Sequence, residues 1–142
     1  MAKRILVIND TQSILELFRL ILEGEGYEMV ASSTPIHHPG EIEQVNPDLI
    51  IIDMVFDQNK EGWQMVQMLK MQRSTASIPI IVCTAAVEAV REMEGHLFAK
   101  GVLVVYKPFD IDDLLATINQ AFESRNHIIS ILEDEDGPAK KT

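Results

Sequence analysis

The feature that most constrains the fold is a series of five short, largely apolar runs separated by longer stretches with helical spacing. The runs cover residues 5–8, 27–31, 49–52, 80–83 and 102–105. Strands that are apolar on both faces are typical of a parallel sheet covered by helices on both sides. After the first run, Ile14, Leu15, Phe18, Ile21 and Leu22 recur at the spacing of an amphipathic helix. The alternation predicts one three-layer α/β domain with right-handed crossovers.

Caps and helix breakers place the remaining elements. We expect Asp10 or Thr11 to cap the first helix, and Gly24 and Gly26 to end it. Further helices are predicted over residues 41–45, 61–72 and 87–100, with a last one beginning near Asp110. The domain is expected to cover residues 1–125. Residues 126–142 are expected to extend the last helix and to end in a polar tail, disordered from residue 133 onward.

Composition excludes several classes of protein. The chain has 142 residues and a formal net charge of -10, which argues against binding to nucleic acids, because these need a basic surface. The same charge argues against docking on anionic membranes. No apolar stretch approaches the roughly 20 residues of a membrane span, so the chain is expected to be cytoplasmic. Its single cysteine, Cys83, rules out an internal disulfide and is expected to be a small buried side chain.

Polar side chains follow four of the five runs. Asn9 and Asp10 follow the first, Asp53 the third, Thr84 the fourth, and Lys107 comes shortly after the fifth. Ligands of parallel sheets bind beyond the carboxyl ends of the strands, so these side chains are predicted to gather on one rim. Each also has an ordinary explanation as a helix cap, a strand end, a turn residue or a solvated charge. It is their combination on one rim that indicates a functional site.

These segments resemble the response-regulator receiver domain of bacterial two-component signalling. The matching pieces are ILVIND at 5–10, PDLIIID at 47–53, PIIVCTA at 79–85 and KPF at 107–109. The resemblance implies a flavodoxin-like sandwich with a five-stranded parallel sheet in the order 2-1-3-4-5. It also implies a phosphorylation-controlled switch that receives its phosphoryl group from a histidine kinase or a phosphotransfer protein. Such a domain is not a conventional enzyme, since it catalyses only its own phosphoryl transfer and dephosphorylation.

The resemblance also gives each matched residue a role. Asp53 would be the phosphoacceptor, while Lys107 and Thr84 would bind phosphoryl oxygens. Mg²⁺ would be held by Asp10, Asp53 and the backbone carbonyl of Val55, with Asn9 as a further candidate ligand. Few protein ligands and several waters suit the octahedral preference of this ion.

The chain departs from the family pattern at several positions. Asn9 stands where the family usually has a second acidic residue, so metal binding is expected to be weakened. Val104 occupies the position of the usual aromatic switch residue. Tyr106 lies two residues later on the same face of the strand, either as a displaced sensor or as a rim residue facing a partner or solvent. In the loop after Asp53, Asp57 could replace the missing charge, or could simply be solvated.

Two other functions remain open on the sequence. One is a non-phosphorylated receiver-like adaptor that acts only by protein binding, which Asn9 and Val104 motivate. The other is a small-molecule enzyme on the same scaffold, since fold alone does not fix function. For the switch, we expect a downstream protein target and the possibility of a homodimer through the last helices. The apolar residues of helix 61–72 either pack on the sheet or form a docking patch.

Overall fold

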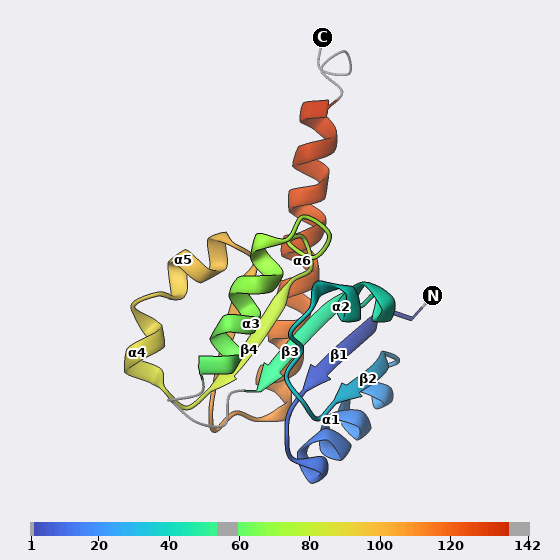
Figure 1. Ribbon diagram of the computed structural model, residues 1–142, viewed down its shortest axis with the longest axis vertical. Helices are drawn as coiled ribbons and strands as arrows, with labels where there is room; N and C mark the ends of the chain where they lie inside the picture. Colours follow the sequence, from blue (N-terminus) through green and yellow to red (C-terminus); the bar gives the residue numbers. More distant parts are fainter. Residues whose placement is uncertain (1, 54–59, 137–142) are drawn as a thin grey trace.

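The computed structural model describes residues 2–53 and 60–136, with side chains in the last helix described up to residue 124. One five-stranded parallel sheet has the order β2-β1-β3-β4-β5, which confirms the predicted topology. Figure 1 shows the strands running side by side through the centre of the molecule. The strands are β1 (Arg4–Ile8), β2 (Glu28–Ser32), β3 (Leu49–Asp53), β4 (Ile80–Thr84) and β5 (Val102–Tyr106).

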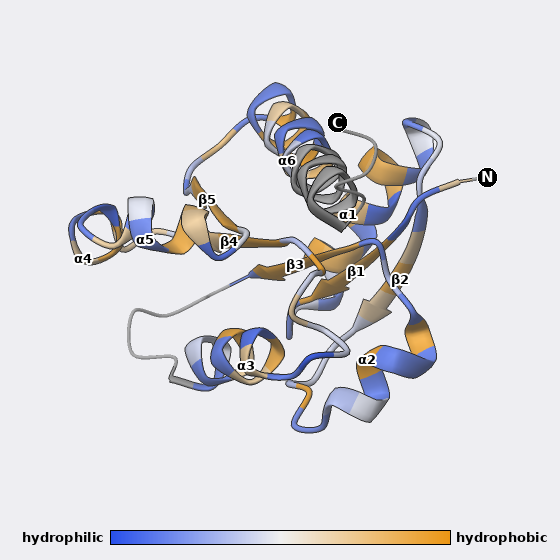
Figure 2. Cartoon of the chain, turned by 90° about the horizontal axis from the view of Figure 1, so that it is seen from above, coloured by the Kyte–Doolittle hydropathy of each residue, from blue (hydrophilic) through white to orange (hydrophobic). Residues whose placement is uncertain are grey.

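Helices cover both faces of this sheet, as Figure 2 shows from above. They are α1 (Gln12–Gly24), α2 (Pro39–Val45), α3 (Lys60–Met71), α4 (Val87–Arg91), α5 (Glu94–Ala99) and α6 (Ile111–Asp136). Alternate residues of the central strands point to opposite faces, so two apolar clusters form. One cluster joins the sheet to α1 and α6, and the other joins it to the remaining helices. The central strands are therefore buried on both sides, which accounts for their unbroken apolar sequences.

The register of the sheet brings the polar strand ends together. Ile8 of β1 pairs with Ile52 of β3, and Asp53 pairs with Cys83 of β4. Thr84, the next residue of β4, pairs with Tyr106 of β5. Because all five strands are parallel, the residues that follow these pairs lie at one edge of the sheet.

Two predicted elements are wrong in detail. The single helix expected over residues 87–100 is two short helices, α4 and α5. At the break, the Met93 N–H donates to the Val90 carbonyl at 2.9 Å, a three-residue spacing that interrupts an α-helix. The tail expected to be disordered from residue 133 is helical as far as Asp136, which the good helix propensity of glutamate supports. Residues 137–142 lie outside the described residues.

The start of α6 agrees with the predicted beginning of the last helix near Asp110. The Asp110 carboxylate accepts a hydrogen bond from the Asp113 N–H at 2.8 Å, which satisfies a backbone donor of the first turn. Figure 1 shows the carboxyl-terminal half of the helix leaving the body of the domain. The boundary predicted after residue 125 stays a prediction.

Cys83 gives a simple test of this packing. Its side chain is 0% exposed, and burial raises the pKa of the thiol far above its usual value, with the Asp53 carboxylate adding to the effect. We expect the native protein not to react with a thiol reagent such as dithionitrobenzoate and the guanidinium-unfolded protein to react fully, because the thiolate is the reactive form. Rapid labelling of the native protein would contradict the described burial of β4.

Candidate functional site

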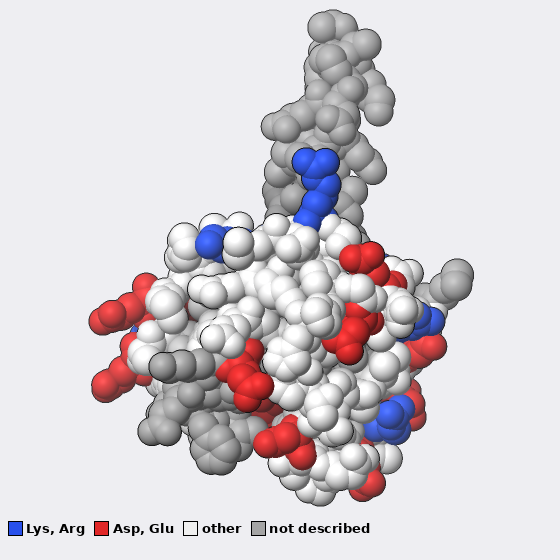
Figure 3. Space-filling model, in the orientation of Figure 1, with Lys and Arg blue, Asp and Glu red and all other residues white. Residues whose placement is uncertain are grey.

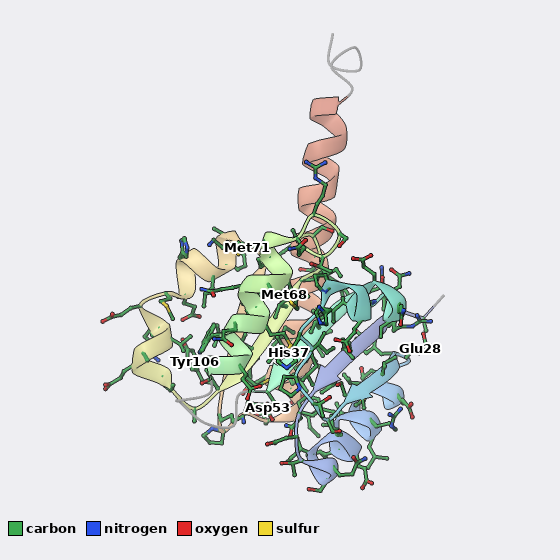
Figure 4. All side chains as sticks on the ribbon, viewed as in Figure 1. Glu28, His37, Asp53, Met68, Met71 and Tyr106 are labelled. Atoms are coloured by element: carbon green, nitrogen blue, oxygen red, sulfur yellow. The ribbon has the colours of Figure 1, made fainter. Side chains whose placement is uncertain are left out.

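Asp53 lies at the carboxyl end of β3, where Figure 4 labels it, and its carboxylate is held from two sides. The Lys107 ammonium forms an ion pair with Oδ1, and the Asn9 amide nitrogen donates to Oδ2. The Asp53 side chain is 6% exposed and that of Lys107 is 28% exposed. A carboxylate this deeply placed needs paired charge and hydrogen bonds, and the ends of β1 and β5 supply them.

The main chain at the end of β1 positions the residues that face Asp53. The Asn9 N–H donates to the Ser32 carbonyl at 3.0 Å, which ties this segment to β2. The Asn9 side-chain oxygen accepts from the Thr11 N–H at 2.7 Å. Thr11 occupies the N-cap position of α1 but makes no side-chain cap bond. Asp10 and Thr11 were both predicted as caps. Among the hydrogen bonds of the described residues, neither side chain caps α1.

Thr84 and Lys107 are linked through the backbone of neighbouring strands. The Lys107 N–H donates to the Thr84 carbonyl at 2.8 Å, directly after the last residue pair of β4 and β5. The Thr84 side chain is 3% exposed, and its hydroxyl oxygen accepts from the Ala86 N–H at 3.1 Å. Because the oxygen is the acceptor there, the hydroxyl keeps its own proton to donate elsewhere.

Asp10 completes the rim from the solvent side. Its carboxylate is exposed and accepts from the Thr11 hydroxyl at 3.3 Å. A pocket of about 170 Å³ lies beside it. The residues around this pocket come from four segments and are Ile8, Asn9, Asp10, Ser33, Thr34, Pro35, Ile52, Asp53, Glu61, Gly62 and Met65. The structure thus brings Asp10, Asn9 and Asp53 to one pocket and joins Lys107 to it through Asp53.

Two predicted site residues are not described, and one pocket residue was not predicted. Val55 and Asp57 lie outside the described residues, so their predicted roles stay predictions. Glu61 was not singled out in the sequence, although it lines the same pocket as Asp10 and Asp53. A carboxylate in the first turn of a helix is ordinarily explained by the helix dipole, so no sequence pattern marked Glu61 as a site residue.

The comparisons with known proteins agree with this geometry. Residues 5–119 match the family model described as the response regulator receiver domain. The chain belongs to the response-regulator receiver family. Its fold and its place in two-component signal transduction follow from this membership, and the expectation that it is not a conventional enzyme is confirmed.

Individual relatives of this receiver domain show how far the likeness extends. It is 29% identical over 126 residues to the DNA-binding dual master transcriptional regulator RpaA of Synechocystis sp., covering 88% of this chain and 51% of RpaA. The chain thus spans about half the length of that relative. A CheY-like receiver domain from Methanospirillum hungatei is 26% identical, with a TM-score of 0.71 over 89% of this chain and 98% of that one.

A more distant structure supports the fold alone. The chemotaxis response regulator CheY4 of Vibrio cholerae is 23% identical, with a TM-score of 0.69, covering 85% of this chain and 99% of that one.

The helices described for this receiver domain include none with the length and apolar character that a membrane span requires.

The donors of the rim fit Mg²⁺, which receiver domains typically bind. Among the described residues no group of three or more His, Cys, Asp or Glu side chains could hold a metal ion. Mg²⁺ does not need such a cage, because it keeps several waters and takes one or two carboxylates. Asp10 and Asp53 provide these, and each oxygen of a carboxylate can accept more than one contact. The Asn9 oxygen is occupied by Thr11, an orientation that does not favour its predicted role as a ligand.

Tyr106, which Figure 4 labels, is not among the residues that line this pocket. Its hydroxyl donates to the Glu94 carboxylate of α5 at 2.9 Å, and the Arg91 guanidinium lies 5.8 Å from the ring centroid. Desolvation by burial, then the hydrogen bond and charge of Glu94, raise the pKa of Tyr106 above its usual value. Of the two interpretations, a rim residue near α4 and α5 agrees with these contacts, while the sensor role stays untested.

The apolar residues of α3 mostly pack on the sheet. Met65, Val66 and Leu69 are buried, and Trp63 and Met68 pack against the same cluster. Met71 differs, since it is 81% exposed at the end of the helix. The helix is thus chiefly a core element, and the docking patch considered from the sequence is reduced to its last residue.

Metal affinity should respond to the residue at position 9. We expect the Asn9→Asp variant to bind Mg²⁺ more tightly than the unmodified chain, by about tenfold, because an added carboxylate in a partly buried site contributes on the order of 1–2 kcal/mol. Tryptophan fluorescence from Trp63 or amide chemical shifts during a Mg²⁺ titration would measure this. Equal affinities in the two proteins would contradict the expectation.

Proposed function

We propose that this receiver domain is a phosphorylation-controlled signalling switch whose phosphoacceptor is Asp53. The phosphoryl group would come from a histidine kinase or a phosphotransfer protein, and receiver domains partner with histidine kinases. The single observation that carries the proposal is the arrangement around Asp53. A nearly buried carboxylate stands at the end of β3, between the ammonium of Lys107 and the amide of Asn9, with Thr84 on the adjacent strand.

The chemistry of this arrangement suits phosphoryl transfer. An Asp53 oxygen attacks the phosphorus and forms an acyl phosphate, while the donor's leaving group departs with its bonding electrons. Lys107 is a point charge at the place where phosphoryl oxygens would lie, and the Thr84 proton is free to donate to one of them. Mg²⁺, held by Asp10, Asp53 and the Val55 carbonyl, would supply the remaining positive charge against the phosphoryl oxygens.

Incubation with acetyl phosphate and Mg²⁺ tests the proposal. Intact-mass spectrometry should show one labile phosphoryl adduct on the unmodified chain and none on Asp53→Ala. Omitting Mg²⁺ should suppress the adduct. An adduct that forms equally on Asp53→Ala would contradict the assignment of Asp53.

The same experiment separates the switch from an adaptor that acts only by protein binding. The departures from the family pattern at Asn9 and Val104 are the observations that favour an adaptor. A protein that never forms the adduct, yet is folded by circular dichroism, would support the adaptor.

We further propose that the output is a protein target rather than nucleic acid. Figure 3 shows acidic side chains spread over the visible face with few basic ones, and the net charge is -10. The relative RpaA, of which this chain spans 51%, is a DNA-binding transcriptional regulator. A homodimer through the last helices remains a second possible outcome, which sedimentation with and without acetyl phosphate would detect.

A further inference from the structure

Asn9 is the residue that most clearly departs from the family pattern, and its contacts define its role. The side chain is 3% exposed. Its oxygen accepts from the Thr11 N–H, and its nitrogen donates to Asp53 Oδ2. The assignment of oxygen and nitrogen is decided by chemistry, because a backbone N–H can only donate and therefore must meet the oxygen. The amide is thus fixed with its hydrogens toward the phosphoacceptor.

We infer that Asn9 shortens the lifetime of the acyl phosphate by donating a hydrogen bond to Asp53 as its negative charge returns. This inference rests on the proposed phosphorylation of Asp53. It gives Asn9 the role of a positioned donor instead of the metal ligand expected from the sequence.

The charge changes during dephosphorylation carry the inference. Water attacks phosphorus, a new P–O bond forms, and the bond between phosphorus and the Asp53 oxygen breaks. The bonding electron pair goes to the Asp53 carboxylate, and the water loses a proton as inorganic phosphate forms. Because the transition state of phosphoryl transfer is loose, most of this charge has already developed on the leaving carboxylate. A fixed donor aimed at that charge stabilises the transition state more than the acyl phosphate.

The forward reaction should respond differently. Before transfer Asp53 is a charged carboxylate, and in a loose transition state it keeps most of its charge. The Asn9 donor then stabilises the starting state and the transition state to a similar extent, so the rate of phosphorylation changes little. A hydrogen bond to a charged group is stronger than one to a neutral carbonyl by an amount that corresponds to about five- to tenfold in rate. Loss of the Asn9 donor should therefore change the rate of decay more than the rate of formation.

Two substitutions separate this role from a structural one. Asn9→Ala removes both the donor to Asp53 and the acceptor for the Thr11 N–H. Asn9→Ser keeps a short side-chain oxygen that can accept from the backbone two residues on, but its shorter side chain loses the donor to Asp53. If Asn9 serves only to hold the start of α1, the serine variant should behave like the unmodified chain.

The experiment measures formation and decay in the same three proteins. Each is phosphorylated with acetyl phosphate at saturating Mg²⁺, the donor is removed by desalting, and the adduct is followed by intact-mass spectrometry. We expect about five- to tenfold slower decay in both variants, and a smaller change in the rate of formation. In the metal-free protein, the Asn9 side-chain amide signals in a ¹⁵N-correlated spectrum should shift on Asp53→Ala, which reports the hydrogen bond directly.

Other outcomes would overturn the inference in distinguishable ways. Equal decay in all three proteins, or slower decay in Asn9→Ala but not in Asn9→Ser, would contradict the donor role alone. A parallel fall in formation and decay would indicate general damage to the site. If the unmodified chain forms no adduct at all, the proposed function fails, and the inference about Asn9 fails with it.

Discussion

Replacing Lys107 with alanine should slow phosphorylation by acetyl phosphate about 10²- to 10³-fold at saturating Mg²⁺. Lys107 contacts Asp53 Oδ1 directly from the end of β5. Removing one positioned electrostatic group from such a site typically costs this factor. The effect should be large because both side chains are shielded from water. Interactions between shielded charges are screened less than interactions between charges at the surface. The initial rate of adduct formation, followed by intact-mass spectrometry, measures it.

Lys100→Ala is the matched control for this prediction. It removes the same charge and the same side chain, but Lys100 lies at the end of α5, beside Gln67 and Met71 and outside the pocket that contains Asp53. Its phosphorylation rate should stay within about twofold of the unmodified chain, since only a distant, exposed charge is lost. If both lysine variants lost activity equally, net charge rather than the Lys107 contact would explain the result.

The second large effect concerns stability. Leu22→Ala should lower the free energy of unfolding by about 2–5 kcal/mol, because Leu22 is 0% exposed and packs with the strands beneath α1. Leu20→Ala changes the same residue type in the same helix, but Leu20 is 76% exposed. It should alter stability by no more than about 0.5 kcal/mol. Urea unfolding followed by circular dichroism compares the two variants.

If Leu22→Ala and Leu20→Ala lowered the free energy of unfolding by similar amounts, the described orientation of α1 would be contradicted. That orientation matters for the site, because α1 begins directly after Asn9, Asp10 and Thr11. The two unfolding curves thus also test whether the helix holds the end of β1 as described.

The sheet and the rim could be predicted because they depend on strong local patterns. Strands buried on both faces must be apolar along their whole length, and the polar residue that ends each run marks the carboxyl edge. The parallel order then brings Asp53 and Lys107 together, although they are 54 positions apart in the sequence. Thr84 follows from the same rule, since it is the last residue of β4.

The parts that could not be predicted depend on single hydrogen bonds or on tertiary packing. The break between α4 and α5 depends on the hydrogen bond from the Met93 N–H to the Val90 carbonyl. The sequence at this point is still typical of a continuous helix. The orientation of Asn9 depends on the Thr11 N–H, because an amide can either donate or accept. The direction of Tyr106 depends on Glu94, which lies on a helix whose position the strand pattern does not fix.

The most direct test of the central claim, that Asp10, Asp53, Thr84 and Lys107 form one phosphoryl-accepting site, is an amide chemical-shift map. Spectra of the ¹⁵N-labelled chain would be compared without additions, with Mg²⁺, and with Mg²⁺ plus beryllofluoride, which mimics a bound phosphoryl group. Mg²⁺ alone should shift amides around Asp10 and Asp53. Beryllofluoride should add large shifts at Asp53, Thr84 and Lys107, and Asp53→Ala should abolish them. Shifts confined to another part of the sheet, or shifts that persist in Asp53→Ala, would contradict the account.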